Sequence, residues 1–105
     1  SSLLGKILYF KFGKESSQVG LKIDEFELAV REHDDVPGNE PIGKNVLRTV
    51  CINGMPEPLL SHLQLHAYAF ADWTAVLAAA KAYVKIKVDN NTAAATAAPA
   101  ALALS

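Results

Sequence analysis

Residues 46–70 read VLRTVCINGMPEPLLSHLQLHAYAF, and the predicted fold depends most on this stretch. Asn53-Gly54 stands between two runs with extended character. Asn-Gly favours a type I′ hairpin turn because both residues tolerate positive φ. We therefore expect Val46–Ile52 to be a strand that pairs with the residues after the turn. Pro56 and Pro58 remove amide donors from one lateral side of the returning strand, which predicts an unpaired sheet edge there.

The same stretch continues as a further predicted strand over Leu60–Phe70. Its apolar residues fall on one face, namely Leu63, Leu65, Ala67 and Ala69. The opposite face carries His62, Gln64, His66, Tyr68 and Phe70, none of which is ionised at neutral pH in its ordinary state. Such a face can lie under a helix, bind a partner protein or stack bases. These five residues are the candidate binding or interface residues.

His62 and His66 also have the i, i+4 spacing of metal ligands on a helix. On the strand expected here, the same spacing is roughly 13 Å at about 3.3 Å per residue, which is too far for one metal ion. The sequence therefore predicts no metal site.

Before this stretch, the apolar residues also recur mainly at every second position, as in a strand. Leu4–Phe12 has the alternation of a strand, and Val19, Leu21 and Ile23 begin another. After Asp24-Glu25 the apolar residues continue on the opposite parity. We interpret this shift as a β-bulge, and a helix over Ile23–His33 is the alternative.

After residue 70 the periodicity changes. Asp72 is a good N-cap residue, and an apolar stripe with helical spacing follows, formed by Trp73, Val76, Leu77, Ala80 and Val84. We expect a helix near 72–83 and then a short strand over Val84–Val88. The predicted fold class is α+β: a mainly antiparallel β-sheet with one C-terminal helix, in a single domain over residues 1–91.

Residues 92–105 form an uncharged, Ala-rich tail in which eight of fourteen residues are alanine. A freely solvated segment is usually polar and charged, so we expect this tail to lie on its own domain or on a neighbouring subunit. Leu102 and Leu104 would supply most of the apolar area, and both are counted among the candidate interface residues.

Composition narrows the function classes. The chain has 105 residues, a net charge of −1 and one cysteine, Cys51, which fits a buried thiol in a reducing compartment. Near-neutral charge disfavours nucleic acid as the main partner. No secretion signal and no membrane-spanning run is visible, so we expect a cytoplasmic or particle-associated protein that does not bind membranes.

No motif for catalysis, phosphate binding or a cofactor stands out. The leading hypothesis is a non-enzymatic structural subunit that assembles into a homo-oligomer. A strand-rich body with a helical end is loosely similar in plan to small viral coat proteins, an analogy of architecture only. The alternative is a small binding module that contacts nucleic acid or a small ligand through the face from His62 to Phe70.

Overall fold

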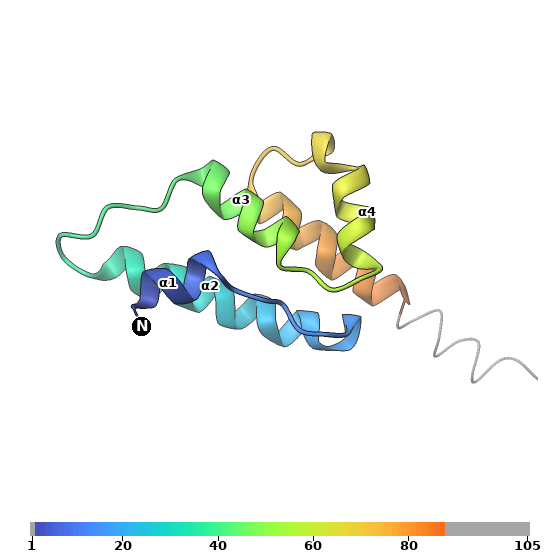
Figure 1. Ribbon diagram of the computed structural model, residues 1–105, viewed down its shortest axis with the longest axis horizontal. Helices are drawn as coiled ribbons and strands as arrows, with labels where there is room; N and C mark the ends of the chain where they lie inside the picture. The colour runs from blue at the N-terminus through green and yellow to red at the C-terminus, as the bar shows by residue number, and fades with distance from the viewer. Residues whose placement is uncertain (1, 88–105) are drawn as a thin grey trace, which may run out of the picture.

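The computed structural model describes residues 2–87, and every regular element in that range is a helix (Figure 1). In chain order these are α1 (Leu3–Leu8), η1 (Ser16–Gln18), α2 (Val19–Asp35), α3 (Lys44–Asn53), α4 (Leu59–Leu65) and η2 (Ala67–Ala69), where η marks a short 3₁₀ helix. A further helix covers residues 73–87. The predicted α+β fold with an antiparallel sheet is therefore wrong, because residues 2–87 contain no strand. The similarity in plan to coat proteins rested on those strands and does not stand.

The long helix α2 explains the parity shift at Asp24-Glu25. Val19, Ile23 and Phe26 are completely buried, and Val30 is nearly so. Their spacing of i, i+4, i+7 and i+11 is one face of a helix, so the bulge was the wrong interpretation and the helical alternative is confirmed. Over a short run, apolar residues spaced for a helix also fit a strand's alternation of two, and the mismatch between the two periods then shows as a shift of parity.

Helix α3 replaces the predicted strand Val46–Ile52. Leu47 and Cys51, one helical turn apart, point into the core. Asn53 is the last residue of α3, and Gly54 caps it with a φ of −82°, so the pair forms no type I′ turn. Pro56 and Pro58 lie at the start of α4, where their carbonyls accept hydrogen bonds from the amides of Leu60 and His62. Proline is tolerated there because the first amides of a helix have no intrahelical acceptor.

An aromatic cluster forms the centre of the core. After α1, the chain runs without regular structure past Phe10 and Phe12, whose ring centroids lie 4.9 Å apart. Both rings meet Phe26 of α2, at 5.1 and 5.2 Å, and Phe26 meets Trp73 at 5.8 Å. These contacts join the first segment (residues 2–15), α2 and the last helix in one core.

The helix over 73–87 begins where the sequence indicates. The Asp72 carboxylate accepts a hydrogen bond of 2.9 Å from the amide of Ala75, as an N-cap residue does. The expected strand from Val84 onward is wrong, because residues 84–87 continue the helix. In Figure 1 this helix runs beside α3 and α4. No helix among residues 2–87 combines the length and hydrophobicity needed to cross a bilayer.

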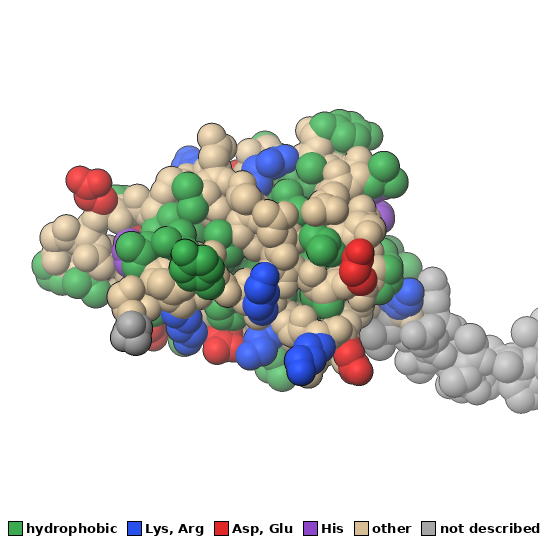
Figure 2. Space-filling model, viewed as in Figure 1, with side chains coloured by type: hydrophobic (Ala, Val, Ile, Leu, Met, Phe, Trp, Pro, Cys, Tyr) green, Lys and Arg blue, Asp and Glu red, His purple; other side chains and the backbone are tan. Residues whose placement is uncertain are grey.

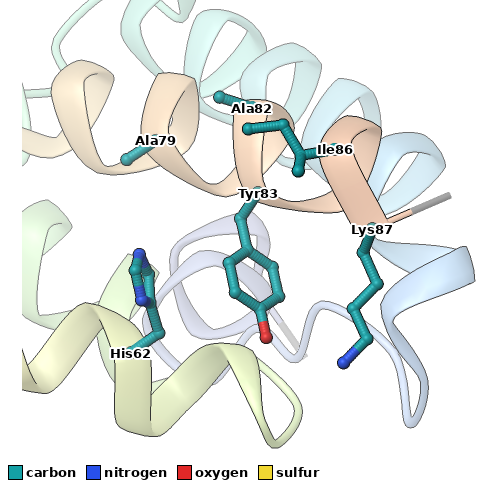
Figure 3. A pocket seen from close by; sticks show the side chains of 6 residues that line it. All are labelled: His62, Ala79, Ala82, Tyr83, Ile86 and Lys87. Carbon is teal, nitrogen blue, oxygen red and sulfur yellow. The ribbon is translucent and has the colours of Figure 1, made fainter. Parts of the chain in front are cut away.

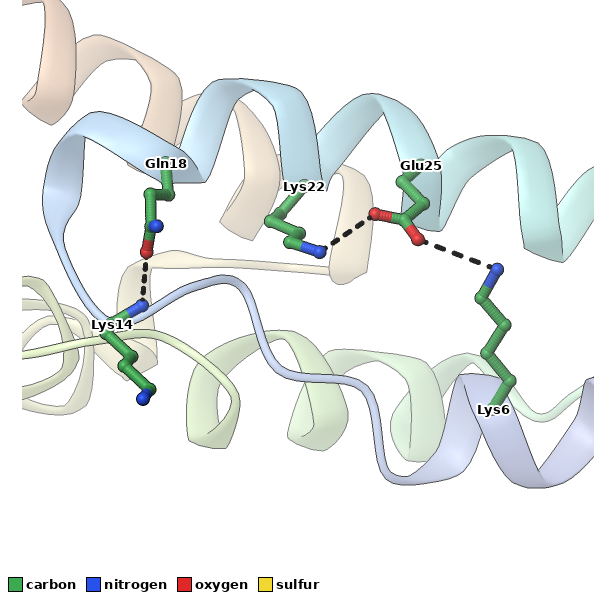
Figure 4. Close-up of polar contacts among 5 residues, drawn as sticks. All are labelled: Lys6, Lys14, Gln18, Lys22 and Glu25. Carbon is green, nitrogen blue, oxygen red and sulfur yellow. Dashed lines mark hydrogen bonds and ion pairs between the residues drawn. The ribbon is translucent and has the colours of Figure 1, made fainter.

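Polar contacts fasten the first segment to α2 (Figure 4). The Gln18 side-chain oxygen accepts a hydrogen bond of 2.7 Å from the Lys14 amide. Glu25 joins the two helices, with Lys6 of α1 at 3.6 Å and Lys22 of α2 at 3.2 Å. The hydrogen bond from Lys22 lowers the pKa of the Glu25 carboxyl. These groups are solvent-exposed, so they orient the segment more than they stabilise it.

Candidate interaction groove

A groove lies between α4 and the helix over 73–87 (Figure 3). It encloses about 470 Å³ and is lined by His62, Ala79, Ala82, Tyr83, Ile86 and Lys87. Five of these six residues come from the last helix, and His62 closes the opposite side. Figure 3 shows the His62 and Tyr83 rings approaching each other from the two helices.

The groove exists because the last helix carries two apolar stripes. The first stripe, with Val76, Leu77 and Ala80 at its centre, is buried in the core. The second consists of Ala79, Ala82, Tyr83 and Ile86, which repeat at i, i+3, i+4 and i+7 and so share a face. Ala82 and Ile86 are exposed, and Ile86 keeps 60 % of its surface accessible. A helix that packs on one core needs only one apolar stripe. The second apolar stripe is therefore the distinctive feature of this surface.

Rings from three segments meet at the wall of the groove. His62 lies 4.8 Å from His66 and 4.8 Å from Tyr83, measured between ring centroids. Tyr68 extends the row, 6.5 Å from His66. Lys87 places its ammonium 6.0 Å from the centroid of the Tyr83 ring, within the range of a weak cation–π contact.

The structure separates the five predicted residues of the stretch 62–70. His62 and His66 lie together because α4 brings residues four apart onto one face. Gln64 is exposed. Tyr68, in η2, is 87 % exposed, whereas Phe70 packs against the core. The single face predicted from a strand is thus wrong. Leu102 and Leu104 lie outside the described residues, as does the whole tail over 92–105.

Sequence reasoning missed three residues of this surface. Tyr83 and Ile86 complete the second stripe, and Leu65, 72 % exposed, follows His62 by three residues on α4. The signal for the first two was present in the sequence, since their spacing with Ala79 and Ala82 is helical. For Ile86 this signal was hidden, because the sequence pattern predicts a strand from residue 84 onward. Figure 2 shows hydrophobic side chains at the surface around α4 and η2.

Of the other hollows on residues 2–87, two have a distinctive lining. One, of about 440 Å³, is apolar and lies between the end of α1 and α3, with Tyr9 and Val46 on its rim. The other, of about 670 Å³, is bordered by Lys11, Lys14 and Lys22. Figure 2 shows several lysine and arginine side chains along the lower edge of the molecule, with acidic side chains between them.

Chemistry at the groove is that of aromatic and imidazole rings. Within residues 2–87, no three or more His, Cys, Asp or Glu side chains gather as metal ligands. Cys51 is completely buried, as predicted, and burial raises the pKa of its thiol to about 12, so it is no nucleophile at neutral pH. The residues around the groove can pack, stack and donate hydrogen bonds.

Comparison of the chain with protein-family models, curated proteins and solved structures gives no match. The residues themselves therefore carry the functional argument. They define a small domain that is all-α over residues 2–87 and carries an apolar groove rimmed with histidine and tyrosine.

Proposed function

We propose that this domain is a self-associating subunit that binds a second copy of itself through the groove between α4 and the helix over 73–87. The observation that carries this proposal is the second apolar stripe of the last helix, with Ala82 and Ile86 exposed. Exposed apolar surface on a small domain is costly in water unless a partner covers it.

The stripe is suited to pairing with its own copy. Ala79 and Ala82 form a shallow recess, and Tyr83 and Ile86 project beside them. When the twofold axis is perpendicular to the helices, the two helices run antiparallel, and each exposed Ile86 can enter the other copy's alanine recess. Antiparallel helices also align their dipoles favourably. Small residues allow the close approach that this packing needs.

The composition of the rim supports a protein partner. Protein interfaces are enriched in tyrosine and depleted in glutamate and lysine at their centre. The groove follows this pattern, with Tyr83 at its centre and Lys87 at its edge. Tyr68 and Leu65 extend the apolar area beyond the groove.

Substitution of two matched alanines tests the proposal. Ala78 and Ala82 are both exposed on the last helix, but only Ala82 lines the groove. Each precedes a lysine by three residues, so a glutamate at either position has a lysine within helical reach. Lys81, the lysine after Ala78, already pairs with Glu27 at 3.6 Å. We expect Ala82→Glu to shift the native mass, measured by light scattering after size exclusion, to the monomer. Ala78→Glu should leave the oligomer intact.

A monomeric wild-type chain at 100 μM or equal masses for the two variants would contradict self-association through the groove. Circular dichroism of both variants shows whether the helices remain, so a folding defect is distinguished from a lost interface.

A second candidate function, anion binding, is favoured by the hollow bordered by Lys11, Lys14 and Lys22. Lys22 is already paired with Glu25, so Lys11 and Lys14 would supply the attraction. The test is fluorescence anisotropy with a labelled oligonucleotide. Lys11→Glu with Lys14→Glu should abolish salt-dependent binding, and Lys81→Glu, on the last helix, should not.

A further inference from the structure

The side chains of His62 and His66 form a pair that the self-association argument does not use. They are one helical turn apart, His62 inside α4 and His66 at its C-cap. Their ring centroids are separated by 4.8 Å, with the ring planes inclined by 57°. Both rings are half-buried, so each keeps part of its edge in solvent. The objection to a metal site was the long spacing along a strand, and a helix removes it.

The separation of the rings fits a shared ion. A zinc ion lies about 2.0–2.1 Å from an imidazole nitrogen, which places it about 3.2 Å from the ring centroid. Two rings on one ion at angles of about 90–110° then have centroids about 4.5–5.2 Å apart. The observed 4.8 Å lies within this interval.

We propose that His62 and His66 together bind a divalent transition-metal ion, of the imidazole-preferring class to which Zn²⁺ belongs. Two nitrogens from α4 occupy two positions, and water fills the others. In a single copy of the domain, the groove beside His62 leaves room for that water. Because no third ligand joins the pair among residues 2–87, binding is weaker than at a closed structural zinc site.

The groups around the pair determine which metal ions can bind. The Tyr83 ring lies against His62, and Tyr68 lies near His66. Lys87 contacts the Tyr83 ring and lines the same groove as His62, and no carboxylate is among these contacts. Hard cations such as Mg²⁺ require oxygen ligands and should not bind here.

Calorimetric titration of the full, untagged chain with ZnCl₂ at pH 7.5 tests this site. The wild type should bind zinc, and His62→Gln and His66→Gln should each weaken binding by about tenfold or more, because the remaining ligand loses its chelate partner. Gln64→Ala is the matched control on an exposed position of the same helix, and it should bind as the wild type does. MgCl₂ is the negative probe.

A second readout keeps the test independent of calorimetric heats. At one zinc concentration, zinc should raise the melting temperature of the wild type and of Gln64→Ala by the same amount, and should raise those of the two histidine variants by less. Absence of wild-type binding at 1 mM zinc would overturn the proposal. So would equal affinity in wild type and both histidine variants, since the ion would then be held elsewhere, for example at His33 and Asp34.

Discussion

The amide of Phe12 donates a hydrogen bond of 2.9 Å to the carbonyl oxygen of Gly54, which joins the first segment of the chain to the end of α3. The approach is close enough that a Cβ atom on Gly54 would lie 2.6 Å from the carbonyl oxygen of Phe10 and 3.0 Å from the Phe12 ring. Glycine is therefore required at position 54 because a side chain has no space there. Its backbone conformation is not the reason, because a φ of −82° is accessible to any residue.

The first prediction is that Gly54→Ala destabilises the domain by about 1–3 kcal/mol, because a methyl group is forced against backbone and a core ring. Gly20, on α2, has nothing within 4 Å of its Cβ position, and Gly20→Ala is expected to stabilise by up to about 1 kcal/mol. Urea denaturation measures both. An unchanged midpoint for Gly54→Ala would contradict the close packing of Phe10 on α3.

The second prediction concerns Arg48, which ties α3 to the segment around η2. Its guanidinium donates to the carbonyl oxygen of Phe70 at 3.0 Å and to that of Ala67. Hydrogen bonds from a charged group contribute about 1.5–3 kcal/mol, so Arg48→Met should destabilise by about that amount. Hydrogen exchange should accelerate at residues 67–70.

Two comparisons sharpen the Arg48 test. Arg48→Lys keeps the charge but lacks the forked donors, and should lose most of the same stability. Arg31→Met, at an exposed position of α2, should change little. If Arg48→Lys behaves as the wild type does, the two carbonyl contacts are not the source of stability.

The core residues of the described helices could be predicted from the sequence better than the elements that carry them. Ile23, Phe26 and Val30 read as apolar positions under either a strand or a helix. Only their spacing distinguishes the two, and short runs satisfy both periods. Exposed Leu21 and Leu28 supplied the false alternation, because an exposed leucine looks the same in the sequence as a buried one.

The interaction groove could be predicted only in part. His62 and Tyr68 were selected because ring side chains are suited to interfaces, an argument that holds in any element. Tyr83 was missed because its partner across the groove, His62, lies 21 positions earlier in the sequence. Contacts between helices depend on how α4 and the last helix cross, and no local pattern contains that information.

The third prediction follows from the N-cap at Asp72. Hydrogen bonds from the Thr74 hydroxyl and the Ala75 amide lower the pKa of the Asp72 carboxyl from its ordinary value of about 3.8. The cap therefore contributes stability above that value, and this contribution is lost as the pH falls through the lower folded-state pKa.

Asp72→Ala should accordingly melt at a lower temperature than the wild type at pH 7, and the difference should shrink as the pH is lowered below about 4. Asp72→Asn also caps a helix but does not titrate, so its melting temperature at pH 7 should be close to that of the wild type. Thermal melts of the three proteins from pH 2 to 7 measure these differences in melting temperature. A constant difference between wild type and Asp72→Ala would show that the carboxylate does not act through the cap.

The last prediction concerns the buried thiol of Cys51. Burial, with a smaller contribution from the charge of Glu27, raises its pKa to about 12. In the unfolded chain a thiol titrates near 8.5, so between these values the unfolded state releases a proton that the folded state retains. The free energy of unfolding of the wild type should then fall by about 1.4 kcal/mol per pH unit over that interval, relative to Cys51→Ala, which has no thiol. Below pH 8 the two curves should run parallel.

At pH 8, a thiol reagent should label native Cys51 only as fast as the core opens. Labelling at the rate of a free thiol, or parallel curves up to pH 11, would mean that Cys51 is accessible and that the α3 face against the core is packed less closely than the structure describes.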